Sequence, residues 1–193
     1  MNESKPRNLL TLPQDLPRPI DDGAATHLEG MRVPSVPLRA TNGEVVDLSA
    51  ISGLVVVFAY PRTGRPGEDP IVPDWDSIPG ARGCTPQACS FRDLAAELES
   101  FSPKIFGLST QTTEYQQEAV ERLHLPFPLL SDSSLSLASS ISLPTHEIAG
   151  QILLKRLAWV QRSGTIEHVF YPVFPPDQSA KEVLEWLRQN VGV

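Results

Sequence analysis

Cysteine is almost absent from this chain: only Cys84 and Cys89 occur among its 193 residues. Two cysteines are too few for the disulfide framework of a small secreted domain, and in a reducing compartment a close pair favours redox chemistry over a structural bond. Histidine is also scarce, and the four histidines are scattered over positions 27, 124, 146 and 168 without the spacing of zinc ligands. We therefore expect no metal and no other cofactor.

Long hydrophobic stretches and an excess of positive charge are both missing. The longest uninterrupted apolar run covers residues 54–60, whereas a membrane-spanning helix needs about 20 residues. Residues 1–10 contain no apolar segment of the kind that a secretory signal requires. The formal net charge of -7 disfavours nucleic acid and anionic membranes as partners, because phosphate groups attract basic surfaces. We expect a cytoplasmic protein that binds neither nucleic acid nor membrane.

Proline, in contrast, is abundant, and its distribution divides the chain. Residues 1–30 are polar and contain four prolines, which indicates a loose or wrapping N-terminal arm rather than a domain. Residues 31–193 are expected to form one domain, because this length and 40% hydrophobic residues suffice for a single core. Within it, residues 61–82 carry five prolines and three glycines, which predicts an inserted loop instead of a helix or central strand. A lid, a dimer contact and a solvated loop all fit this composition.

The rest of the sequence alternates between strand and helix patterns. Asn42 and Gly43 separate two short strand-like runs at 36–40 and 44–48, which predicts a hairpin whose two turn residues both have positive φ. Further strands are predicted at 54–60, 104–109, 127–130, 153–161 and 165–171, and helices at 85–101, 113–124, 133–141 and 179–190. Strands that alternate with helices form a sheet with a parallel part, and the late hairpin adds antiparallel strands. The predicted fold is α/β and thioredoxin-like: a central mixed sheet flanked by helices, with an N-terminal hairpin.

The two cysteines lie at the start of the predicted helix that follows the inserted loop. The free N–H groups and roughly half a positive charge at a helix N-terminus favour a thiolate over a thiol, and the thiolate is the reactive species. Five helical residues correspond to about 140° of rotation and about 7.5 Å of rise, whereas a disulfide needs Cα atoms within roughly 7 Å. If Cys84 and Cys89 bond, the first turns must unwind, which suits a catalytic disulfide that cycles. The alternative is that both are ordinary buried helix residues.

The sequence around these cysteines resembles the active-site region of the peroxiredoxins. The matching segments are Tyr60-Pro61 and the continuous stretch GCTPQACSFRD at residues 83–93. The likeness is greatest to the bacterioferritin-comigratory, or Q-type, group, in which both cysteines lie on one helix. Further matches follow at 107–110, 128–132, 155–157 and 164–166, so the resemblance extends from about residue 30 to the end of the chain.

The resemblance implies roles for three residues. Cys84 would attack the peroxide oxygen and become a sulfenic acid, and Cys89 would resolve it as an intramolecular disulfide. Arg156 would stabilise the thiolate and the peroxide oxygens, as a permanent cation can; the alternative is a surface arginine beside Lys155. The implied function is a thiol-dependent peroxidase that reduces hydrogen peroxide or organic hydroperoxides. Its partner would be a thioredoxin-like or other dithiol reductant, and the chain would be a monomer or homodimer.

One departure from the family pattern affects the peroxide site. The family has a threonine three residues before the reactive cysteine, which hydrogen-bonds the peroxide, and this chain has Ala81 there. Thr63 or Ser77 from the inserted loop are the candidate replacements. The departure leaves open a second function on the same fold, a thiol-disulfide oxidoreductase or redox sensor with weak peroxidase activity. A third possibility, a non-catalytic binding protein, is disfavoured by the retained cysteines and Arg156.

Overall fold

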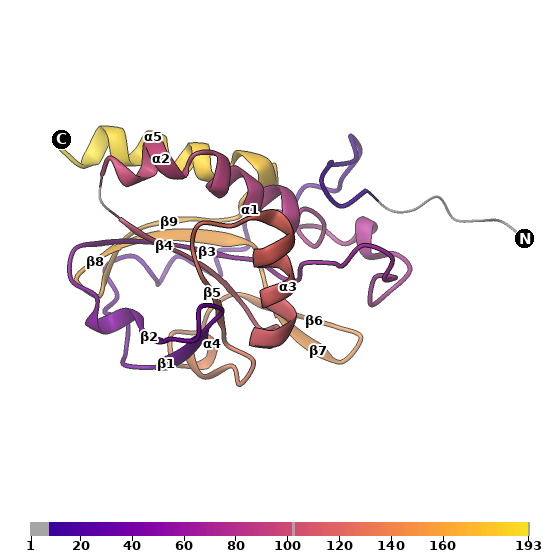
Figure 1. Cartoon of the computed structure of the whole chain (residues 1–193), viewed down its shortest axis with the longest axis horizontal. Helices are drawn as coiled ribbons and strands as arrows, with labels where there is room; N and C mark the ends of the chain where they lie inside the picture. Colours follow the sequence, from indigo (N-terminus) through magenta and orange to yellow (C-terminus); the bar gives the residue numbers. More distant parts are fainter. Residues whose placement is uncertain (1–7, 102, 193) are drawn as a thin grey trace, which may run out of the picture.

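The computed structural model describes residues 8–101 and 103–192, which fold around a seven-stranded sheet (Figure 1). Its strands are β1 (Pro37–Ala40), β2 (Val45–Asp47), β3 (Leu54–Ala59), β4 (Lys104–Ser109), β5 (Leu129–Ser131), β8 (Leu157–Arg162) and β9 (Thr165–Phe170), in the spatial order β2-β1-β5-β4-β3-β8-β9. β4 is parallel to both β3 and β5, and the other neighbouring pairs are antiparallel. The predicted central mixed sheet is confirmed.

β3 forms the centre of the hydrophobic core because both of its faces are covered. Its six residues are all buried, and alternate side chains of a strand point to opposite faces of the sheet. Val55 and Val57 pack into one apolar cluster, whereas Val56 and Phe58 pack into another on the opposite face. The run of three β-branched valines at 55–57 suits such a doubly covered strand.

Helices cover the two faces unequally. The helices are α1 (Cys84–Asp93), α2 (Ala95–Glu99), α3 (Thr113–Leu123), α4 (Ser136–Ser140) and α5 (Ser179–Asn190), with single 3-10 turns η1 (Leu48–Ala50), η2 (Trp75–Ser77) and η3 (Pro176–Gln178). Buried side chains of α1, α2, α3 and α5 share the cluster of Phe58, and those of α4 share the cluster of Val57. Figure 1 shows α1, α2 and α5 together above one face of the sheet.

The helix predicted at 85–101 is interrupted, which corrects the sequence-based prediction. α1 ends at Asp93, Leu94 leaves the helical conformation (φ -102°, ψ 8°), and α2 starts at Ala95. The break preserves the apolar face, because Phe91 and Leu98 are both fully buried in the same cluster. The periodicity of the side chains therefore could not reveal it.

The strand predicted at 153–161 is also wrong, because it divides into two strands. β7 (Gln151–Leu154) pairs with β6 (Thr145–Ile148) in a separate antiparallel hairpin, and β8 starts only at Leu157. The hairpin turns through Ala149 and Gly150, which both have positive φ. At the first hairpin, in contrast, only Gly43 of the Asn-Gly pair has positive φ.

The proline-rich segment and the N-terminal residues pack on the domain. Residues 61–82 contain no regular element beyond η2, yet Trp75 and Ala81 are buried in a small cluster with Ile148 and Leu153 of the β6–β7 hairpin. Residues 8–30 contain no helix or strand, and Leu28 is fully buried against the sheet. No helix in the described residues is long and apolar enough to cross a membrane.

Candidate active site

The start of α1 places Cys84 at a tightly packed turn. Gly83 caps the helix with φ 107°, and a Cβ on it would lie 2.6 Å from Pro176 and 2.9 Å from Leu12. Only glycine fits both this conformation and this space. The first helical hydrogen bond runs from Gln87 N to Gly83 O over 2.9 Å. Cys84 itself is 3% exposed, so the surrounding side chains rather than bulk water determine the state of its thiol.

Arg156 reaches Cys84 from the link between β7 and β8. Its Nη2 lies 3.2 Å from Cys84 Sγ and also donates to the carbonyl oxygens of residues 80, 81 and 82, at 3.1, 3.2 and 3.1 Å. Arg156 is 2% exposed, and no carboxylate of the described residues forms an ion pair with it. A buried cation requires a compensating charge. Among the groups that contact the guanidinium, the Cys84 sulfur is the one that can carry a negative charge.

A residue missed by the sequence reasoning, Gln87, orients the guanidinium. Gln87 is fully buried one turn after Cys84, and its Oε1 accepts from Arg156 Nη1 over 2.5 Å. Its Nε2 donates to Ser179 Oγ at the start of α5, over 3.2 Å. The contact therefore ties α1, α5 and the β7–β8 link together. The sequence signal that could have identified Gln87 is its position. It is an amide three residues after Cys84, on the helix face that also carries Phe91.

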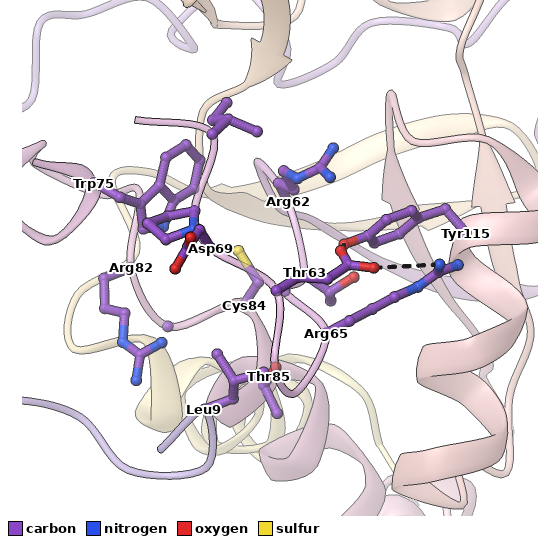
Figure 2. A pocket seen from close by; sticks show the side chains of 15 residues that line it. Leu9, Arg62, Thr63, Arg65, Asp69, Trp75, Arg82, Cys84, Thr85 and Tyr115 are labelled. Carbon is purple, nitrogen blue, oxygen red and sulfur yellow. Dashed lines mark hydrogen bonds and ion pairs between the residues drawn. The ribbon is translucent and has the colours of Figure 1, made fainter. Parts of the chain in front are cut away.

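A small polar cavity of about 40 Å³ opens onto Cys84. Figure 2 shows the sulfur pointing between Thr63 and the loop that carries Asp69 and Trp75. Thr63 is buried, and Gln111 holds it: the Thr63 N–H and hydroxyl both donate to Gln111 Oε1, over 2.9 and 3.1 Å. Ser77 does not line the cavity, so of the two candidate replacements for the family threonine only Thr63 borders this space.

The inserted loop and the N-terminal residues cover the cavity. Leu9 lines it, together with Arg82, whose side chain is 7% exposed (Figure 2). The Arg82 guanidinium donates to the carbonyl oxygens of Asn8 and Thr11, and burial lowers its pKa from the ordinary arginine value. Arg82 is a second buried cation near Cys84 that the sequence reasoning did not single out.

Cys89 lies farther along α1 and is half-buried, whereas Cys84 is buried, and both are free cysteines. Burial raises the pKa of Cys89 above its ordinary value; Asp93 raises it further, whereas Arg92 and Arg122 act in the opposite direction. The helix is continuous from Cys84 to Asp93. Both cysteines are therefore present in their reduced arrangement, and the structure contains no bond between them.

The fold and the site together define a class of protein: a thioredoxin-like domain with a buried, arginine-paired thiol at the start of a helix. Within the described residues, no group of three or more histidine, cysteine, aspartate or glutamate side chains is placed to hold a metal ion.

Comparison with known proteins assigns this class to a family. The Redoxin family model matches residues 28–184, and the chain belongs to the redoxin family. Peroxiredoxin Q, chloroplastic, from Oryza sativa subsp. japonica is 26% identical over 161 residues, which cover 83% of this chain and 66% of the rice protein. Peroxiredoxin bcp1 from Schizosaccharomyces pombe is 29% identical over 136 residues, which cover 69% of this chain and 60% of the yeast protein.

Solved structures agree with this assignment. The peroxidoxin BcpB from Mycobacterium tuberculosis superimposes with a TM-score of 0.67 at 27% identity, covering 85% of this chain and 98% of that protein. Peroxiredoxin Q from Xanthomonas campestris has the same fold, with a TM-score of 0.62 at 23% identity, covering 91% of this chain and 96% of that one. The predicted thioredoxin-like fold and the predicted resemblance to Q-type peroxiredoxins are thereby confirmed.

Proposed function

We propose that this chain is a thiol-dependent peroxidase in which Cys84 reduces the peroxide and Cys89 resolves the product. The observation that carries the proposal is the 3.2 Å contact between Arg156 Nη2 and Cys84 Sγ, beside a small polar cavity. A fixed, permanently charged guanidinium stabilises a thiolate and also the negative charge that develops on a peroxide oxygen. The redoxin family and its peroxiredoxin relatives support the same chemistry.

The first step converts the Cys84 thiolate to a sulfenic acid. The sulfur attacks one peroxide oxygen, the O–O bond breaks, and the departing hydroxide or alkoxide takes up a proton and leaves as water or alcohol. Sulfur is oxidised and the peroxide is reduced. Arg156 holds the attacking sulfur, and the Thr63 hydroxyl, which lines the cavity, would hydrogen-bond the bound peroxide in place of the threonine replaced by Ala81.

The second step forms a disulfide between Cys84 and Cys89. The Cys89 thiolate attacks the sulfenic sulfur, an S–S bond forms, and the hydroxyl leaves as water. A thioredoxin-like or other dithiol reductant then returns both thiols to their reduced state. Because residues 84–93 form continuous helix in the reduced arrangement, the start of α1 must unwind before the two sulfurs can meet.

The size of the cavity favours a small substrate. A space of about 40 Å³ exceeds the roughly 10–15 Å³ that one water molecule needs, but not by enough for a bulky organic group. We therefore propose hydrogen peroxide as the preferred substrate, with larger hydroperoxides admitted only when Leu9 and the 61–82 loop move. We further propose that the chain acts in the cytoplasm, as a monomer or homodimer.

A second candidate function rests on Ala81. Without a threonine at that position the peroxide loses one hydrogen-bond donor, which favours a thiol-disulfide oxidoreductase or redox sensor that reacts slowly with peroxide. The decisive experiment measures consumption of hydrogen peroxide by the purified chain, with and without dithiothreitol. Repeated turnover only with the dithiol is the expected result. Fewer than one equivalent consumed, together with rapid reduction of a disulfide substrate, would overturn the peroxidase proposal.

A further inference from the structure

A second cavity lies on the other side of Arg156 from the peroxide site. This back pocket has a volume of about 340 Å³ and shares no lining residue with the cavity at Cys84. It is lined by Arg18, Pro19, Ile20, Asp22, Pro79, Gly80, His146, Lys155, Arg156, Tyr171 and Pro172. Its volume is at the lower end of the range of about 300–1,000 Å³ that is usual for small-molecule sites. Arg156 thus separates the two cavities and belongs to the wall of the back pocket.

The back pocket contains polar atoms that lack a partner. Arg156 Nε and His146 Nε2 are both inaccessible to solvent, and neither has a hydrogen-bond partner among the described residues. Arg156 as a whole is 2% exposed, and its two Nη atoms are occupied by other groups. A buried polar atom without a partner is unfavourable, and two side chains that line the back pocket each retain one such atom.

The charge of the back pocket is opposite to that of the chain. Three cations, Arg18, Lys155 and Arg156, line it, whereas the whole chain has a formal charge of -7. Its one carboxylate, Asp22, is already engaged by Lys155 Nζ over 2.5 Å and by the Tyr171 hydroxyl over 2.7 Å. The pocket therefore favours an anion.

The remaining walls indicate what kind of anion. Pro19, Ile20, Pro79 and Pro172 form apolar walls beside the polar end. His146 adds one donor and no fixed charge at neutral pH, because burial and the nearby cations Lys155 and Arg156 lower its pKa. An anion with one negative charge and a compact apolar body matches both the polar end and the apolar walls of the back pocket. Inorganic phosphate would leave the apolar walls uncovered.

We propose that the back pocket binds a small organic carboxylate whose charge competes with the Cys84 sulfur for Arg156. A carboxylate in the back pocket, which Arg156 lines, would partly offset the charge of the guanidinium that supports a thiolate at Nη2. The bound ligand therefore weakens the support for the thiolate and slows the chemistry of Cys84 without occupying the peroxide cavity. This goes beyond the peroxidase function, because it concerns a separate site and predicts an effect on any reaction of the Cys84 thiolate.

Benzoate is the test ligand, and benzamide is its uncharged counterpart. In the full chain with Cys89→Ser, calorimetry should detect benzoate binding with a Kd on the order of 1 mM, a strength usual for so few non-hydrogen atoms. At saturating concentration, benzoate should slow alkylation of Cys84 by iodoacetamide about three- to tenfold relative to the same concentration of sodium chloride. The reason is that solvent and salt screen the interaction between the carboxylate and the Arg156 guanidinium only in part. Because no peroxide is used, this result is independent of whether the peroxidase proposal holds.

Variants locate the effect. His146→Leu and Arg18→Gln should each weaken benzoate binding at least fivefold. At the same benzoate concentration, each variant should also show less slowing of Cys84 alkylation than the parent protein. Arg188→Gln is the matched control, because it removes an equal charge from α5 outside the back pocket, where Arg188 pairs with Glu97. Any one of four results would overturn the proposal. These are no benzoate binding, equal slowing of alkylation by benzamide, slowing of alkylation by phosphate but not by benzoate, and an unchanged response to benzoate in both pocket variants.

Discussion

Arg156 Nη2 lies 3.2 Å from Cys84 Sγ, and the two side chains are 2% and 3% exposed. They are 72 residues apart in the sequence. Residues 80–82 and Gln87 supply the other hydrogen-bond acceptors of the guanidinium, and all of these are neutral. The sulfur is therefore the group in this arrangement that gains most from becoming negative.

Replacement of Arg156 by methionine should slow the reaction of Cys84 with hydrogen peroxide about 100-fold, the usual effect of losing one group that stabilises developing charge. Stopped-flow kinetics under single-turnover conditions measures this rate. Arg162→Met at the end of β8 is the control, because Arg162 is exposed and pairs with Glu167. A thermal melt distinguishes slower chemistry from unfolding. An Arg156→Met protein that is folded and reacts at the wild-type rate would remove Arg156 from the mechanism.

The two cysteines should have separable roles. Cys84→Ser should abolish peroxide consumption, because it removes the attacking sulfur. Cys89→Ser should consume one equivalent of peroxide and stop at the sulfenic acid, which a dimedone adduct detected by mass spectrometry would identify. Equal first-equivalent activity of the two variants would contradict the proposed assignment.

Oxidation should unwind the first turns of α1. In the reduced arrangement Cys84 and Cys89 belong to one continuous helix, which places them about 7.5 Å apart along the axis and about 140° apart around it. Several backbone hydrogen bonds, each worth about 0.5–1.5 kcal/mol net, must therefore break before the disulfide forms. Amide hydrogen exchange should show lower protection at residues 84–92 after oxidation and unchanged protection in β3. Equal protection in both states, with the disulfide verified by mass, would refute this prediction.

The rate of disulfide formation should continue to rise with pH above the pH range in which an ordinary thiol ionises. Burial raises the pKa of Cys89, so its thiolate, the species that attacks the sulfenic acid, continues to increase above about pH 8.5. Rapid-quench mass spectrometry after one equivalent of peroxide measures the rate. Asp93→Asn should shift the rise to lower pH, because Asp93 also raises this pKa. The matched control is Glu185→Gln on α5, and a profile shifted equally by both variants would contradict the argument.

Thr63 should contribute to peroxide binding, whereas Ser77 should not. Thr63→Val removes the hydroxyl that borders the cavity, and we expect the rate with peroxide to fall about tenfold, equivalent to about 1.4 kcal/mol. Because that hydroxyl also donates to Gln111, the thermal midpoint must be measured in parallel. Thr63→Ser should restore the rate, and Ser77→Ala should leave it unchanged. Loss of activity in Ser77→Ala but not in Thr63→Val would reverse the assignment.

Local sequence signals were sufficient for the elements whose formation depends on near neighbours. The apolar run at 54–60 predicted a buried strand, and the helix predicted from residue 85 starts one residue earlier, at Cys84. Boundaries were less certain where a tertiary contact ends an element. The interruption at Leu94 lies within a sequence whose apolar pattern continues unchanged, and the predicted strand divides at the charged pair Lys155-Arg156. Periodicity reports which side chains are buried, not where the backbone leaves its element.

The sequence by itself determined the order of the strands of the central sheet and of the helices between them, the position of both cysteines relative to a helix start, and the family resemblance. It did not predict the β6–β7 hairpin or the break between α1 and α2. Only the tertiary structure decided that Thr63 rather than Ser77 borders the cavity and that Gln87 joins α1 to α5. The physical reason is the range of the interactions. Helix starts and strand patterns depend on residues within one or two turns, whereas these contacts join segments separated by long connections, whose paths depend on the packing of the whole chain.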